Sequence, residues 1–326
     1  MLGKRMDLRT VVVLSILAIF RLKVEGGGLS YDYYEQSCPQ VENIVRAGLQ
    51  SLSLSDPTTP ASLLRLMFHD CQVQGCDASI LVDSYDGRSA LEMSSSKNLG
   101  IRKRETISLI KSMVEVVCPQ VVSCADILIL AARDAVAMSG GPRINVPLGR
   151  RDSSTPPSNK LADALLPPAD IGVDGTLRLF FKKGMTIEES VAIMGAHTIG
   201  VTHCFNLLDR LYSSEGGADI EPGFAILLKL SCPLVSFTSN TSFVPNDPTT
   251  FIFDNQYYIN ALGGHGILRV DAELQSDLRT TPVVKRFAVD QDAFFRAFSS
   301  AFVKLSSSGV LTGKQGMIRR RCSVMN

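Results

Sequence analysis

Two residues four positions apart, Arg65 and His69, have the side chains of a small polar reaction site. They fall in a segment that begins near Pro60 and repeats apolar residues at helical spacing, so both side chains should project from one helix face. An imidazole there can take up and return a proton, and a guanidinium can stabilise negative charge on a ligand. The alternative for His69 is a packed core histidine, because Leu66 and Met67 beside it point into the interior.

A second histidine, His197, stands just beyond another predicted helix. Thr186 and Glu189 have the spacing of a capping box, and the apolar residues Val191 and Ile193 continue the pattern toward the histidine. This predicted helix therefore leads into His197.

The elements that must position these residues are mostly helical. An amphipathic pattern runs from Val41 to Leu52, and a second helix begins at the cap Ser123, with Asp126 three residues on, and ends at Met138. Further helical patterns cover 218–230, 255–262 and 287–305. Because no sustained alternation of apolar and polar residues appears, we predict an all-α fold with very short strands at most.

A proline-rich segment from Asp152 to Pro168 separates the earlier helices from the later ones. We place the boundary between two helical halves there, at 29–151 and 152–326. The chain of 326 residues is long enough to bury a large core, and no internal repeat is evident. The two halves are expected to form one domain that clamps something between them.

The first 28 residues have the pattern of a removable secretory signal. Lys4, Arg5 and Arg9 precede the apolar run Val11–Phe20, and glycines follow. The alternative is a membrane anchor, but this run covers only about half of the roughly 20 residues that a spanning helix needs. We therefore expect a soluble, exported protein with no membrane partner.

Export changes how the eight cysteines are interpreted. In a secreted chain they predict an oxidised framework of four bridges, although counting alone leaves roughly a hundred pairings and only Cys71 and Cys76 are close in sequence. Zinc is the competing use, but no Cys-x-x-Cys pair occurs and the four histidines are scattered. The sequon at Asn240 could carry a glycan on the surface.

The charge balance excludes polyanion binding. Lys and Arg number 33 against 32 Asp and Glu, so no strong field exists to hold nucleic acid. The run Arg319, Arg320 and Arg321 is the only compact basic cluster, and we interpret it as a solvated or salt-bridged face.

Five ordered motifs resemble those of the plant secretory haem peroxidases, from about Leu29 to Asn326. Residues 64–71 with 75–81, LRLMFHDC and GCDASIL, resemble the family's distal haem signature. The others are 122–127 (VSCADI), 147–152 (PLGRRD), 195–200 (GAHTIG) and 253–258 (FDNQYY).

The resemblance implies a haem b site with His197 as the axial iron ligand. By similarity Asp271 accepts the other ring N–H of His197 and increases its donor strength.

His69 would be the general acid and base toward hydrogen peroxide, and Arg65 would stabilise the developing charge. Asn98 would accept a hydrogen bond from His69, although 96–102 (SKNLGIR) departs from the family pattern and needs a one-residue insertion before Glu92. Phe68 would wall the pocket and Pro167 would border the site of phenolic donors.

Two calcium ions are also implied by the resemblance, held by carboxylate, hydroxyl and carbonyl oxygens. The distal ligands would be Asp70, Val73, Gly75, Asp77, Ser79 and Glu92, and the proximal ligands Thr198, Asn246, Thr249, Ile252 and Asp254. Asn246 stands where the family usually has an aspartate, with Asp247 beside it, so either a ligand charge is lost or the loop shifts by one residue. We expect the proximal ion to be the weaker one.

The same resemblance implies the cysteine pairs Cys38 with Cys118, Cys71 with Cys76, Cys124 with Cys322, and Cys204 with Cys232. It also implies the activity: a monomeric enzyme that consumes hydrogen peroxide, as in peroxide catabolism and oxidative stress, and oxidises small phenolic donors, as in lignin and wall chemistry. We expect it in the extracellular space or cell wall, with the vacuole as the alternative. The competing functions are a secreted scaffold without turnover and an intracellular peroxide scavenger of related fold; the second is disfavoured by the export signal and the cysteines.

Overall fold

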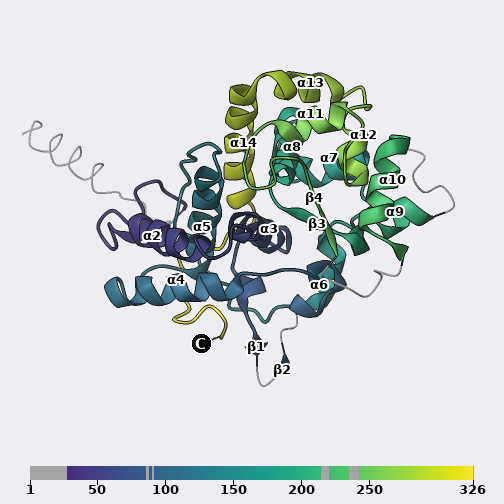
Figure 1. Ribbon diagram of the computed structural model, residues 1–326. Coiled ribbons are helices and arrows are strands. Elements are labelled where there is room, and N and C mark those ends of the chain that lie inside the picture. The colour runs from purple at the N-terminus through teal and green to yellow at the C-terminus, as the bar shows by residue number, and fades with distance from the viewer. Residues whose placement is uncertain (1–27, 86–87, 90–91, 214–219, 235–241, 326) are drawn as a thin grey trace, which may run out of the picture.

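The computed structural model describes residues 28–325 apart from 86–87, 90–91, 214–219 and 235–241. Residues 1–27 of the predicted signal peptide and Asn240 lie outside the described part of the chain. Figure 1 shows helices throughout, with the helices of the first half on one side and α7–α13 on the other. The prediction of a mostly helical fold is confirmed.

The helices of the first half surround one buried helix. Their bounds are α2 (Val41–Ser53), α3 (Thr59–Gln72), α4 (Arg104–Val117) and α5 (Cys124–Met138). The helix α5 is apolar on nearly all sides and is buried from Cys124 to Val136, as expected of a central helix. The hydroxyl of Ser123 accepts a hydrogen bond from the Asp126 N–H, which confirms the predicted cap. Because α3 packs against α5, the face that carries His69 is anchored to the core.

The second half is built from shorter helices. They are α6 (Asn159–Leu165), α7 (Val173–Phe181), α8 (Ile187–Met194), α9 (Leu208–Tyr212), α10 (Pro222–Ser231), α11 (Gln256–Leu262), α12 (Arg269–Glu273), α13 (Thr281–Val289) and α14 (Gln291–Ser306). The predicted capping box at the start of α8 is present: the Thr186 hydroxyl accepts from the Glu189 N–H and the Glu189 carboxylate accepts from the Thr186 N–H.

Strands are few and short in the described residues. β1 (Ser84–Tyr85) pairs antiparallel with β2 (Arg88–Ser89), and β3 (Val201–His203) pairs antiparallel with β4 (Phe243–Pro245). In the second pair Thr202 lies opposite Val244. The strand β3 follows His197 closely, so this small sheet holds the chain that leaves the histidine.

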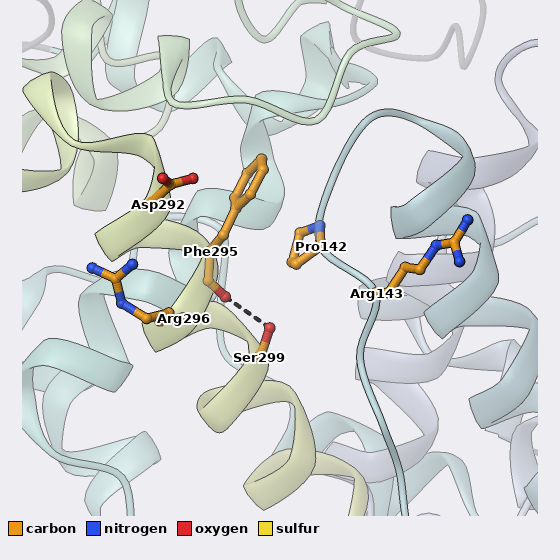
Figure 2. Close-up of a pocket in the computed structure, with 6 residues that line it drawn as sticks. All are labelled: Pro142, Arg143, Asp292, Phe295, Arg296 and Ser299. Atoms are coloured by element: carbon orange, nitrogen blue, oxygen red, sulfur yellow. Dashed lines mark hydrogen bonds between the residues drawn. The ribbon is translucent and has the colours of Figure 1, made fainter.

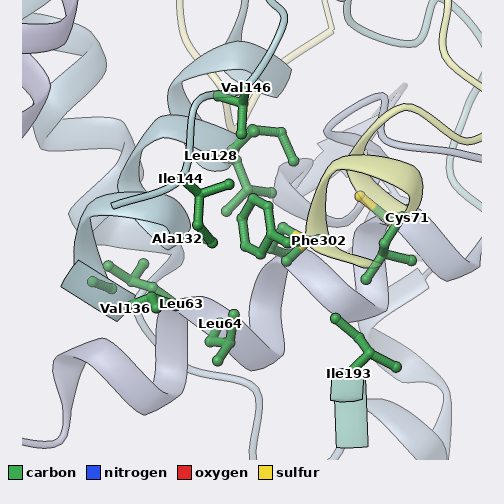
Figure 3. Close-up of a cluster of buried hydrophobic side chains, with 14 of the residues drawn as sticks. Leu63, Leu64, Cys71, Leu128, Ala132, Val136, Ile144, Val146, Ile193 and Phe302 are labelled. Atoms are coloured by element: carbon green, nitrogen blue, oxygen red, sulfur yellow. The ribbon is translucent and has the colours of Figure 1, made fainter. Parts of the chain in front are cut away.

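The core joins the two halves. Figure 3 shows side chains from α3, α5, α8 and α14 in one cluster, among them Leu63, Leu128, Ile193 and Phe302. These side chains are buried, and burying each of them contributes roughly 1.5–3 kcal/mol. The helices that carry His69 and precede His197 therefore share one packed interior.

Two expectations about helices are corrected. The predicted helix over 287–305 is two helices divided at Asp290, whose backbone is not helical and whose carboxylate accepts from the Ala293 N–H as the cap of α14. Within the described part of the pattern over 218–230, residues 220 and 221 are not helical and α10 begins at Pro222, with Glu221 as its cap. The helix α4 was not predicted, although Ile107, Ile110 and Val114 bury one face of it.

The basic run near the C-terminus is not a solvated face, because Arg319 is fully buried. Its guanidinium donates to the carbonyl oxygens of Ala78 at 2.6 Å and Cys322 at 3.0 Å, and its Nε lies 3.8 Å from the Asp152 carboxylate. Arg320 and Arg321 are exposed. Of the two predicted interpretations, the solvated face is therefore wrong for Arg319, while its ion pair with Asp152 agrees with the salt-bridged alternative.

All four predicted disulfides are present. They join Cys38 to Cys118, Cys71 to Cys76, Cys124 to Cys322, and Cys204 to Cys232. The third spans 198 residues and ties the C-terminal segment to the start of α5. Every cysteine is paired, as expected of an oxidised framework.

Candidate functional site

His197 lies in a short 3₁₀ segment, Gly195–Thr198, directly after α8. A Cβ atom at Gly195 would lie 2.5 Å from the Tyr258 hydroxyl and 2.5 Å from the ring of Phe294, so only glycine allows α11 and α14 to approach this closely. The side chains of Tyr258 and Phe294 therefore pack against the chain two residues before His197.

The ring of His197 is held by a carboxylate 74 residues later in the chain. Its Nδ1 lies 3.0 Å from Oδ1 of Asp271 in α12, and Oδ2 of Asp271 accepts from the Leu268 N–H at 2.9 Å. Burial lowers the pKa of His197, but the charge and the hydrogen bond of Asp271 together outweigh burial and raise it. Burial raises the pKa of Asp271, but the contact with His197 and the other hydrogen bonds to the carboxylate hold it below its ordinary value. An ionised Asp271 accepts only, so Nδ1 of His197 carries a proton, and in the neutral ring that could bind a metal the lone pair is on Nε2.

His69 in α3 has a matching arrangement with an amide. Its Nδ1 lies 2.8 Å from Oδ1 of Asn98, and Nδ2 of Asn98 donates to the Glu92 carbonyl oxygen at 2.9 Å. Since that carbonyl oxygen can only accept, it fixes the orientation of the amide, and His69 must donate from Nδ1. Nε2 of His69 is therefore the basic nitrogen of the neutral ring.

Arg65 acts on both histidines. Its Nη2 donates to the Leu99 carbonyl oxygen at 3.0 Å, and its charge lowers the pKa of His69 and of His197. Burial, assisted by Arg65, lowers the pKa of His69 to about 3, so its ring is neutral at physiological pH. Burial and the charge of Arg102 lower the pKa of Arg65 to about 10, so it remains a cation. A cation is therefore held near both imidazoles by its bond to the Leu99 carbonyl oxygen.

This set of residues fits a haem. The side chain of His197 is 35% exposed while that of Asp271 behind it is 4% exposed, so one edge of the ring is anchored and the other is accessible. A neutral imidazole with a free Nε2 and a hydrogen-bonded Nδ1 is the donor set of a haem axial ligand. The ring of Phe68 contacts His69 edge-on, with centroids 5.8 Å apart, and packs against Phe180.

Three of the predicted distal calcium residues, Asp70, Asp77 and Glu92, are buried carboxyl groups. Asp70 accepts from the Ala78 N–H and Asp77 accepts from the Ser79 N–H, each at 3.0 Å, while Oδ1 of Asp70 is buried without a donor. Burial raises the pKa of Asp70, Asp77 and Glu92, the last to about 8, and a cation would relieve this. Nowhere in the described residues do three His, Cys, Asp or Glu side chains converge as a metal cage. An ion here would therefore need the Ser79 hydroxyl and the carbonyl oxygens of Val73 and Gly75 as well.

At the predicted proximal calcium site the loop is shifted by one residue. The Thr198 hydroxyl donates to Asp247 at 2.8 Å and to Asp254 at 3.2 Å, and the Thr249 hydroxyl contacts the same two carboxylates at 3.0 and 3.1 Å. Asn246, in contrast, bonds Thr202 and the Ile199 carbonyl oxygen. The structure thus brings Asp247, rather than the predicted Asn246, together with Thr198, Thr249 and Asp254. The side chain of Ile252 is about half exposed, and its N–H donates to the Thr249 carbonyl oxygen.

Pro167 follows directly on α6, whose end is held by a lysine that the sequence analysis missed. Nζ of Lys97 donates to the carbonyl oxygens of Asp163 at 2.6 Å and Leu166 at 2.5 Å, and the Ser95 hydroxyl donates to the Asp163 carboxylate at 2.5 Å. The signal for Lys97 was its place in the segment that departs from the family pattern. Tyr257, which bonds Asp271, was likewise quoted only as part of a motif.

Surface depressions lie elsewhere. One of about 400 Å³ is lined by Pro142, Arg143, Asp292, Phe295, Arg296 and Ser299. Figure 2 shows its two arginines pointing away from each other, so they do not form one anion site. None of its residues belongs to the candidate site.

Comparison with known proteins agrees with this geometry. Residues 41–290 match the family model described as Peroxidase. Three Arabidopsis thaliana proteins are similar over nearly the whole chain: Peroxidase 29 is 56% identical, covering 93% of this chain and 90% of its own. Peroxidase 12 is 41% identical, covering 92% and 83%, and Peroxidase 18 is 39% identical, covering 96% and 95%.

Proposed function

Because this chain belongs to the plant secretory haem peroxidase family, it is a peroxidase that acts on hydrogen peroxide, and we propose that it oxidises phenolic donors in two one-electron steps. In the balanced reaction one hydrogen peroxide and two phenols give two waters and two phenoxyl radicals. The observation that supports the proposal is the pair of anchored imidazoles: Nδ1 of His69 lies 2.8 Å from Oδ1 of Asn98, and Nδ1 of His197 lies 3.0 Å from Oδ1 of Asp271.

His69 moves the proton. Its Nε2 is unprotonated because Nδ1 donates to Asn98, so Nε2 takes a proton from one peroxide oxygen and returns it to the other, which leaves as water. Arg65 donates toward the oxygen on which negative charge develops. Losing one preorganised donor of this kind costs about 10² to 10³ in rate.

His197 would hold the iron of a haem b through Nε2, with Asp271 fixing the ring and increasing its donor strength. The bound haem would supply the two-electron chemistry that no side chain of this site has. Phe68 would border the pocket above it. Residues 29–151 would then form the half that binds peroxide and residues 152–326 the half that holds the iron.

The donor class and the cellular setting are further parts of the proposal. Phenols would be oxidised beside Pro167, as expected of a phenolic donor:hydrogen-peroxide oxidoreductase, with wall phenolics as the natural class. Two calcium ions would brace the site, through Asp70, Asp77, Ser79 and Glu92 on one side and Thr198, Asp247, Thr249 and Asp254 on the other. The four disulfides fit export to the extracellular space or cell wall. No described helix is long and apolar enough to cross a membrane.

The test is spectroscopy and turnover on the purified full chain loaded with haem. We expect a Soret band and peroxide-dependent oxidation of guaiacol, with His69→Leu keeping the band and losing activity and His197→Ala losing tight haem binding. The control is His265→Leu, which removes an exposed imidazole on a loop beside Phe224 and should change neither result. A colourless folded protein without turnover would support the inactive scaffold instead. Full activity in His69→Leu would remove His69 from the proposed proton transfer.

A further inference from the structure

We propose that Tyr257 is a positioning residue of the proximal side, which sets how strongly Asp271 binds the ring N–H of His197 and thereby tunes the iron. This inference rests on the proposed function, since it concerns the haem that His197 would hold. It adds a third member to the pair of His197 and Asp271.

The observation is a shared oxygen atom. The Tyr257 hydroxyl donates to Oδ1 of Asp271 at 2.8 Å, and Nδ1 of His197 lies 3.0 Å from the same Oδ1. The other oxygen, Oδ2, accepts from the Leu268 N–H at 2.9 Å. Two donors therefore compete for one carboxylate oxygen, and one of them is the imidazole that would bind the iron.

The hydroxyl is a fixed donor. Tyr257 is buried in α11, and its ring lies edge-on to His197 with centroids 6.1 Å apart. Burial, together with the Asp271 charge, raises the pKa of Tyr257 well above its ordinary value, so the phenol stays protonated. Because Asp271 is also buried, the tyrosine supplies a hydrogen bond that bulk water would otherwise make.

The shared oxygen predicts the direction in which Tyr257 changes the reduction potential of the iron. A hydrogen bond from Tyr257 withdraws electron density from Oδ1 and weakens its attraction for the His197 N–H. Without the hydroxyl, Asp271 would concentrate its charge on the imidazole, make it a stronger donor and stabilise ferric over ferrous iron. Tyr257 therefore keeps the reduction potential higher than the pair of His197 and Asp271 would alone.

The adjacent Tyr258 provides a matched control. It lies in the same helix, is equally buried, and donates to the carbonyl oxygens of Val191 at 3.0 Å and Ala192 at 3.3 Å, not to Asp271. Tyr257→Phe and Tyr258→Phe thus remove the same atom from neighbouring buried rings. Only the first should change the proximal ligand.

The experiment measures the ferric/ferrous reduction potential and, by resonance Raman on the reduced protein, the iron–histidine stretching frequency. For Tyr257→Phe we expect the ratio of ferric to ferrous stability to rise threefold to tenfold, a tenfold change being about 59 mV for one electron, and the stretching frequency to rise. Tyr258→Phe should leave both at the wild-type values. A tyrosine analogue fluorinated beside the hydroxyl at position 257 keeps the ring and donates more strongly, so it should shift both readouts in the opposite direction.

Three results would overturn the inference: no shift in Tyr257→Phe, an equal shift in Tyr258→Phe, or the same direction for the phenylalanine and the fluorinated variants. Failure of the proposed function looks different, because the wild-type protein itself would then show no Soret band and no iron–histidine stretch.

Discussion

The ammonium nitrogen of Lys97 lies 2.5 Å from the carbonyl oxygen of Leu166, the residue that immediately precedes Pro167. Its neighbour Asn98 bonds His69. One short segment therefore holds both the peroxide-side histidine and the edge of the proposed donor site.

Replacing Lys97 with Met should weaken donor binding. A hydrogen bond to a charged group contributes about 1.5–3 kcal/mol, and its loss frees the end of α6, so we expect the KM for guaiacol to rise several-fold, up to about tenfold. The rate of reaction with peroxide should stay unchanged. Lys160→Met, an exposed lysine in the same helix, is the control. Equal losses in the rate of donor oxidation and in the rate of reaction with peroxide would show that Lys97 supports the fold in general and not the donor site.

Replacing Asn98 with Leu should slow the reaction with peroxide while the Soret band persists. A positioned general base such as His69 contributes a factor of about 10² to 10⁴ to the rate. Without the amide of Asn98 the His69 ring can turn and change tautomer, so we expect the rate to fall by roughly tenfold to a hundredfold. Stopped-flow spectroscopy at neutral pH measures this rate. Wild-type kinetics in this variant would remove Asn98 from the site.

The pH dependence of the peroxide reaction should be a wide plateau. His69 must be neutral to accept a proton, so the rate falls as the pH drops through its pKa of about 3. Arg65 must be charged, so the rate falls as the pH rises through its pKa of about 10. A rate that halves near pH 6.5, the ordinary value for histidine, would contradict this environment for His69.

The calcium content of variants should show whether Asp247 or Asn246 is a ligand of the proximal ion. Because Asp247 shares hydroxyl partners with Asp254 whereas Asn246 does not, we expect Asp247→Asn to retain one calcium fewer than the wild type and to melt at a lower temperature. Asn246→Ala should keep both ions. Elemental analysis during mild chelation measures this, and the proximal ion should leave first. Simultaneous loss of both ions, or loss only in Asn246→Ala, would count against the assignment.

The buried arginine near the C-terminus should be far more sensitive than its neighbour. Arg319→Met leaves Asp152 buried without its cation and should lower the free energy of unfolding by about 3–5 kcal/mol. Arg320→Met, at an exposed position, should change it by no more than about 0.5 kcal/mol. Chemical denaturation with the disulfides intact provides the comparison, and equal effects would show that burial of Arg319 does not matter to stability.

The sequence by itself determined what depends on neighbours within a few helical turns. The caps at Ser123 and Thr186 and the spacing of Arg65 and His69 on one face follow from local hydrogen bonding and helical periodicity. The cysteine pairing and the hydrogen bond between His197 and Asp271 were predicted from the resemblance to a family. No local sequence pattern indicates either of them.

Only the tertiary structure decided which remote groups meet. Asp271 reaches His197 across 74 residues and shares its oxygen with Tyr257, and the carbonyl of Leu166 meets a lysine 69 residues before it. Burial of Arg319 was likewise hidden, and the sequence left open whether Asn246 or Asp247 meets Thr198, which the structure decides in favour of Asp247. The reason is physical: a side chain's charge, exposure and partners depend on the packing of segments far apart in the chain, and spacing along the sequence carries no record of that packing.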